Sequence, residues 1–238
     1  MINDALTLEI FEALMAQDTI NPPGNEKRGA LCLKEIFDRE GIPCEVQDLG
    51  DNRANFIASF GEGDKILEYS GHLDVVPCVG NWQHTAIGTT EEGELIYGRG
   101  ACDMKGGVAV QLKLAAELTA QDTDYNLTYI FYDNEEVASE LSGLARLIRN
   151  HGELITDADF GVLLEPTNGT IKGGCNGTMR FFVRTRGLAA HSGRAWRGEN
   201  AIHALAPALA ALASYEPKTI AVEGLDYREG LNAVQISG

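Results

Sequence analysis

Residues 66–77 read ILEYSGHLDVVP, an apolar run followed by glycine, histidine and, two residues later, aspartate. The run at 66–69 predicts a strand. Residues two apart on extended backbone face the same side, so the Asp74 carboxylate is expected to accept the N–H of the His72 ring and to leave the other ring nitrogen free for a metal ion. For this motif alone, a buried histidine with a carboxylate partner and no metal is the more common alternative.

Around this strand, helical and strand-like segments alternate along the chain. Apolar residues recur at helical spacing over 4–16 and 26–40, and Gly41 and Pro43 end the second helix. Further strands are expected at 44–47, 55–60, 127–132 and 160–164, and further helices at 105–119 and 139–150. This alternation predicts an α/β domain whose sheet is mixed but largely parallel and is flanked by helices.

The pattern changes after the Gly173-Gly174 pair. Strands are expected there at 178–186, 219–222 and 231–237, with an alanine-rich helix at 200–213 that is kinked near Pro207. We therefore predict one domain over 1–174 and the start of a smaller α+β domain over 175–238. The second domain is expected to be incomplete, because a strand that reaches the last residue leaves a sheet edge without a partner.

Composition excludes several classes of partner. The net charge of -16 disfavours nucleic acid and anionic lipid. No run approaches the roughly 20 apolar residues of a membrane helix, and no basic stretch opens the chain. We expect a soluble, cytoplasmic protein that binds neither nucleic acid nor membranes. The five cysteines are scattered without a C-x-x-C pair, which predicts reduced thiols.

A glycine-rich loop, GRGACDMKGG, covers residues 98–107. It lacks the spacing of the phosphate-binding glycine loops. An aspartate in such a tight loop suits a cation better than a phosphate. Asp103 could equally cap the helix that follows, which is a common use of aspartate.

Glutamates follow two of the predicted strands directly. Glu135 and Glu136 come after the strand at 127–132, and Glu165 comes after the next strand. Ligands of open α/β sheets bind at the carboxyl ends of the strands, so these side chains can converge with His72. One histidine and several carboxylates are a donor set that fits zinc.

The motifs of this chain, taken in order, are GHLDVVP at 71–77, GRG at 98–100, DMKG at 103–106, Glu135-Glu136, Glu165-Pro166, AHS at 190–192 and NA at 200–201. Together they resemble the signature of the zinc aminoacylase and carboxypeptidase family over residues 66–238. The resemblance implies a catalytic domain of the zinc exopeptidase type, interrupted by a lid or dimerisation domain through which two copies associate. It also implies two zinc ions, with cobalt as an alternative metal.

The resemblance assigns a role to each matching residue. His72 and Glu165 would be ligands of the first zinc, Asp103 would bridge both ions, and Glu136 would be a ligand of the second. Glu135 would be the general base, since proton transfer needs a carboxylate that is not bound to metal.

Three further features are implied in the same way. Asp74 would support His72, and His191 would stabilise the oxyanion in the partner subunit's site. The Asp103–Met104 peptide bond would be cis.

The stretches at 132–137, 164–167, 174–178 and 227–232 are most similar to succinyl-diaminopimelate desuccinylases of the actinobacterial type. The implied reaction, a step of lysine and diaminopimelate biosynthesis, is hydrolysis of N-succinyl-LL-diaminopimelate to succinate and LL-diaminopimelate. Asn176, Arg194 and Asn232 are the candidate substrate-binding residues. Many desuccinylases have arginine where this chain has Cys175-Asn176, so an acetylornithine deacetylase, an aminoacylase or a dipeptidase stays an alternative.

The family signature continues beyond the residues present here. A last histidine ligand of the second zinc would lie in that part. The sequence is therefore interpreted as a C-terminally truncated member, and the chain alone is expected to be a poor or inactive enzyme. An inactive relative with a binding or assembly role is the alternative from a different functional class.

Overall fold

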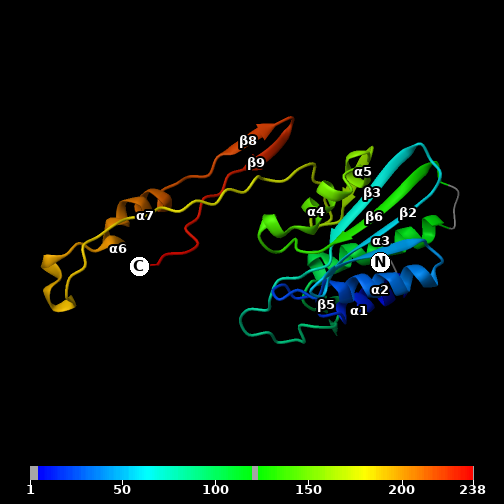
Figure 1. Ribbon diagram of the computed structural model, residues 1–238, viewed down its shortest axis with the longest axis horizontal. Coiled ribbons are helices and arrows are strands. Elements are labelled where there is room, and N and C mark those ends of the chain that lie inside the picture. Colours follow the sequence, from blue (N-terminus) through cyan, green and yellow to red (C-terminus); the bar gives the residue numbers. More distant parts are fainter. Residues whose placement is uncertain (1–4, 120–122, 238) are drawn as a thin grey trace. The chain divides into compact units, whose positions relative to one another are not determined.

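The computed structural model describes residues 5–119 and 123–237, and the chain divides into two compact units, 1–169 and 170–238. The first unit is built on a five-stranded mixed sheet in the order β1-β2-β6-β3-β7 (Figure 1). Its strands are β1 (Cys44–Gly50), β2 (Arg53–Phe60), β3 (Lys65–His72), β6 (Tyr125–Tyr132) and β7 (Phe160–Leu163). The predicted α/β class is confirmed.

The sheet changes its pairing direction in the middle. β1, β2 and β6 pair antiparallel, whereas β3 pairs parallel with both β6 and β7. His72 is the last residue of β3, and the candidate glutamates Glu135, Glu136 and Glu165 follow β6 and β7. A short hairpin of β4 (Thr90–Glu92) and β5 (Leu95–Tyr97), which the sequence did not predict, precedes the glycine-rich loop.

Helices cover both faces of the sheet. The helices of this unit are α1 (Ala5–Met15), α2 (Glu26–Arg39), α3 (Gly106–Thr119), α4 (Gly143–Asn150) and the short α5 (Glu153–Thr156). On one face Phe56 and Phe131 pack in the main core with residues of α1, α2 and α3. Their neighbours on the same strands, Ile57 after Phe56 and Ile130 before Phe131, face the other way and pack against Leu147 of α4. This alternation of faces is the two-residue period of a strand covered on both sides.

Two predicted helices differ from the observed ones at their starts. The helix predicted at 105–119 is preceded by a wide turn, η1 (Ala101–Lys105), inside which Asp103 and Met104 have non-helical backbone angles. The helix predicted at 139–150 is a 3-10 turn, η2 (Ser139–Leu141), followed by α4. The extended Ser142 separates the two pieces, and its hydroxyl caps α4 by accepting the N–H of Ala145.

The second unit contains η3 (Ser192–Arg197), α6 (Ala201–Ala204), α7 (Ala206–Ala213) and a hairpin of β8 (Thr219–Val222) and β9 (Leu225–Arg228). The expected helix at 200–213 is thus two helices that meet at Leu205. The strands predicted at 178–186 and 231–237 are wrong, because neither segment is a strand among the described residues. β8 instead pairs with β9 through a turn at Glu223 and Gly224, both of which have positive φ, as tight hairpin turns require.

Among the described residues, no helix combines the length and the apolar character needed to span a membrane.

Candidate metal centre

The carboxyl ends of the three parallel strands meet at one edge of the sheet. His72, the last residue of β3, pairs with Tyr132, the last residue of β6, and Ser70 pairs with Leu163, the last residue of β7. Residues that follow β6 and β7 therefore lie beside His72. This register places Glu135, Glu136 and Glu165 at the same edge.

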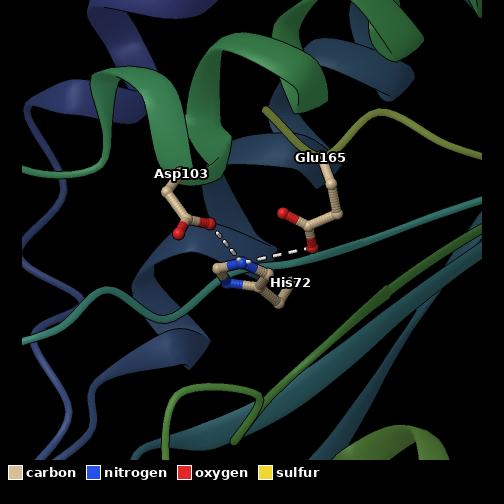
Figure 2. A group of neighbouring side chains, drawn as sticks. All are labelled: His72, Asp103 and Glu165. Carbon is tan, nitrogen blue, oxygen red and sulfur yellow. Dashed lines mark hydrogen bonds and ion pairs between the residues drawn. The ribbon is translucent and has the colours of Figure 1, made fainter. Parts of the chain in front are cut away.

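His72 lies between carboxylates that come from different elements. Its Nε2 is 3.0 Å from Asp103 Oδ1, in the turn before α3, and 3.6 Å from Glu165 Oε1, after β7 (Figure 2). A second group joins His72 with Glu135 and Glu136. In each group, one candidate ligand atom from every residue lies within 4.8 Å of the others. The two groups share His72, whose side chain is only 1% exposed.

The backbone of the glycine-rich loop brings Asp103 to this edge. Gly100 has a φ of 84°, and a Cβ at this position would lie 2.5 Å from Val75 Cγ1, so the turn requires glycine for both conformation and space. The amide of Lys105 closes the turn by donating to the Gly100 carbonyl at 2.9 Å. The predicted cis peptide between Asp103 and Met104 is confirmed.

The predicted bond between the Asp74 carboxylate and the His72 ring is wrong. His72 Nδ1 lies 2.8 Å from the backbone carbonyl of Asp74, whereas the nearest carboxylate oxygen is 3.7 Å away. The alternation rule fails here because β3 ends at His72, so Asp74 is no longer on strand backbone. The carbonyl has the predicted effect all the same, since it accepts a hydrogen bond from the Nδ1–H group and leaves Nε2 available to a metal.

The Asp74 carboxylate holds the glutamate pair instead. Its two oxygens accept the backbone N–H groups of Glu135 at 3.0 Å and Glu136 at 3.1 Å. The side chain of Asn21 donates to the same carboxylate at 2.9 Å. Sequence reasoning missed Asn21, whose only signal is an asparagine before two prolines, a pattern that is common in turns.

The charges at this edge perturb one another. Burial lowers the pKa of His72, but its bond to Asp103 and the negative charges of Asp74 and Glu165 outweigh this effect and raise the pKa to about 9. The bond to His72 holds the pKa of Asp103 below its ordinary value. Burial raises the pKa of Glu165 to about 7, even though His72 opposes the shift, and burial together with the charge of Asp103 raises that of Glu136. A divalent cation would relieve this crowding of carboxylates.

The donor set fits zinc. One imidazole nitrogen and carboxylate oxygens are ligands that zinc takes in proteins, and the described residues bring them close enough to share an ion. A cavity of about 330 Å³ adjoins the centre and is lined by residues that include Asp103, Glu136, Arg99 and Trp82. The Arg99 guanidinium lies 4.7 Å above the Trp82 ring, so the cavity combines one cation with an aromatic wall.

The other predicted site residues belong to the second unit. His191 caps η3, where its Nδ1 accepts the Gly193 N–H at 3.0 Å. Asn176 donates to the Arg228 carbonyl at 2.8 Å. Arg194 lies within η3, and Asn232 follows β9. The roles of all four residues at the site stay predictions.

Comparison with known proteins gives a family match and several relatives. The sequence pattern of peptidase family M20/M25/M40 matches residues 69–227. A succinyl-diaminopimelate desuccinylase of Corynebacterium glutamicum is 36% identical over 218 residues, which are 91% of this chain and 57% of that protein. A Mycobacterium tuberculosis protein provisionally given the same name is 43% identical over 169 residues, 71% of this chain and 46% of its own. The chain thus spans about half the length of these relatives.

Solved structures share the fold. A tripeptidase of Staphylococcus aureus aligns with a TM-score of 0.59 at 17% identity, and the alignment covers 94% of this chain and 63% of the tripeptidase chain. An M20 family metallo-carboxypeptidase of Sulfolobus solfataricus aligns with a TM-score of 0.58 at 20% identity, and the alignment covers 68% of this chain and 37% of the carboxypeptidase chain.

Proposed function

Because the chain belongs to peptidase family M20/M25/M40, a family of metallohydrolases, we propose that it hydrolyses N-succinyl-LL-diaminopimelate to succinate and LL-diaminopimelate. The observation that carries the hydrolytic part is the group at the sheet edge, where His72, Asp103 and Glu165 point their ligand atoms at one another. The choice of substrate is supported by the similarity to the Corynebacterium and Mycobacterium proteins.

Four residues would hold the two zinc ions. We assign His72 and Glu165 to one ion, Glu136 to the other, and Asp103 to both. When bound, zinc would supply a Lewis acid that polarises the amide carbonyl and lowers the pKa of water. Protons compete with zinc for His72 and Glu165, so zinc binding depends on whether these two side chains are protonated.

Glu135 is the residue that we assign to proton transfer. Its carboxylate is exposed, while its backbone N–H is fixed by Asp74. The side chain would take a proton from the water that attacks the carbonyl carbon and deliver it to the leaving nitrogen as the C–N bond breaks. The products are then a free succinate and a free amine, and Glu135 returns to its starting state.

The second unit extends the proposal. We assign residues 175–238 to a lid that also carries the dimer contact, and residues 1–174 to the catalytic domain. His191 would stabilise the oxyanion, and Asn176, Arg194 and Asn232 would contact the substrate. These residues supply donors, which suits a substrate with several carboxylates.

The test is zinc content together with hydrolysis of a panel of N-succinyl, N-acetyl and dipeptide substrates. We expect succinate release from N-succinyl-LL-diaminopimelate to exceed turnover of every other member of the panel. Preference for N-acetylornithine, for another N-acyl amino acid or for a dipeptide would move the assignment to the corresponding activity within the family. Zinc binding without any hydrolysis would support the inactive relative instead.

A further inference from the structure

A buried hydrogen-bond network runs from the surface of the first unit to the glutamate pair, and two of its members have no part in the candidate metal centre. We propose that Asn21 and Arg53 are positioning residues that fix the orientation of the Glu135-Glu136 turn. The importance of this turn rests on the proposed function, which makes one glutamate a base and the other a metal ligand. The positioning itself is a property of the metal-free chain and can be measured there.

The turn is held at its backbone. Asn134, directly before Glu135, has a positive φ of 59°, a left-handed conformation that asparagine adopts more readily than most other non-glycine residues. The next two amides both donate to the Asp74 carboxylate, which is fully buried. Because the two side chains leave adjacent backbone positions, a rotation of this turn would move both carboxylates relative to His72.

Asn21 connects the Asp74 carboxylate with Asn134, the residue that begins the turn. Its Nδ2 donates to Asp74 Oδ2 and to Asn134 Oδ1, each at 2.9 Å, and the residue is 1% exposed. Its own backbone is fixed, since its N–H donates to the Val75 carbonyl at 2.9 Å. One buried amide therefore holds the carboxylate that binds the turn and also the residue that begins the turn.

Arg53 determines which way the Asn21 amide faces. Its Nη2 donates to Asn21 Oδ1 at 3.3 Å, so the nitrogen of that amide is directed at Asp74. Its Nη1 donates to Asn134 Oδ1 and, at 2.9 Å, to the buried carboxylate of Glu26. A guanidinium can serve these acceptors together because its donors form a rigid planar fork, which an ammonium lacks.

The alternative is that the network only stabilises the fold. If the network only stabilises the fold, a substitution should speed hydrogen exchange of backbone amides throughout the first unit. If it positions the turn, exchange should become faster only at the turn. Two variants of nearly unchanged size separate these cases. Arg53→Lys keeps the charge and loses the fork, and Asn21→Asp replaces the donor that faces Asp74 with an acceptor. Arg39→Lys and Asn150→Asp are the matched controls, because both residues are exposed and lie outside the network.

The measurement is hydrogen exchange of individual amides, followed by NMR in the metal-free chain. We expect the amides of Glu135 and Glu136 to exchange about tenfold faster in Arg53→Lys, as expected for the loss of one buried hydrogen bond. The acceleration should be larger in Asn21→Asp, which loses both donated bonds and places a second carboxylate against Asp74. Amides of residues 57–60 in β2 and 127–130 in β6 should change by less than about twofold, because these paired segments lie at the other end of their strands from Arg53 and the turn. Neither control should alter exchange at the turn.

Unchanged exchange at the turn in both variants would overturn the proposal. Equal acceleration in the turn and at residues 57–60 of β2 would also overturn it, since the network would then stabilise the fold as a whole. If the chain hydrolyses the proposed substrate, the same variants should lower kcat more than they change KM. A native chain that hydrolyses nothing counts against the proposed function alone, because the exchange rates still decide the positioning.

Discussion

At the scale of single residues, His72 is under opposing influences. Burial disfavours its charged form, while Asp103 and Glu165 favour it, so that the metal-free side chain keeps a proton up to a pKa of about 9. The same carboxylates that favour the proton are the ones that would accompany His72 around a metal ion. Proton and metal therefore compete for one ring nitrogen.

Metal affinity should depend steeply on pH. We expect zinc affinity of the metal-free chain to rise as pH rises through the pKa of Glu165, about 7, and that of His72, about 9, because both side chains then lose the proton that competes with zinc. Calorimetry in buffers with different enthalpies of ionisation would detect the released protons. Binding that is independent of pH, or that weakens as pH rises in this range, would contradict the assignment of these ligands.

Glu135→Gln separates the base from the ligands. The amide keeps the shape of the side chain but cannot accept the proton, so turnover should fall about 100- to 10,000-fold while zinc content stays at the native level. Metal analysis and steady-state kinetics on the same preparation check both parts. Lost zinc would show that Glu135 is a ligand, and normal turnover would place the base elsewhere.

At the scale of elements, the site depends on how strands end and helices begin. His72 ends β3, the Glu135-Glu136 pair follows β6 and Glu165 follows β7. These residues lie together because the three parallel strands end at the same edge of the sheet. Asp103 arrives differently, on the turn before α3 that Gly100 makes possible. A change in that turn should therefore affect the metal centre without altering the sheet.

Gly100→Ala tests this turn. We expect a loss of about 1–3 kcal/mol in the free energy of unfolding, since alanine there is strained at positive φ and meets Val75. Zinc affinity should fall as well, because Asp103 shifts with the loop. Gly93→Ala is the matched control: its φ is 63° with no atom within 4 Å of the added Cβ, so it should lose only about 1 kcal/mol and keep its zinc affinity. Equal effects of the two substitutions on zinc affinity would refute the role of the Gly100 turn.

At the scale of the whole molecule, metal binding should stabilise the folded chain. The ligands come from residues 72 to 165, which only the fold brings together, so zinc binds the folded state in preference to the unfolded one. The net charge of -16 adds to this effect, because a bound cation reduces repulsion within the molecule.

Zinc should therefore raise the melting temperature. At a free concentration 100 times Kd the gain is about 2.7 kcal/mol for one site. His72→Ala should abolish most of the rise, because both candidate groups contain His72, whereas His151→Ala at the end of α4 should leave it intact. A rise that survives His72→Ala would place the metal at other residues.

The sequence by itself determined the α/β class, most elements of the first unit and the family, because periodicity records burial and the motifs stand at the ends of strands. It did not determine the partner of β8, since residues 225–228 and 231–237 suit a strand by local composition and only the turn at Glu223 and Gly224 selects the first. Nor did it show the Asn21 network. Its hydrogen bonds link Asn21 to partners that lie 53 and 113 positions further along the chain, and no local sequence pattern encodes contacts between segments that distant. The tertiary structure alone decided the network, because hydrogen bonds between side chains depend on which faces the packed sheet and helices bring together.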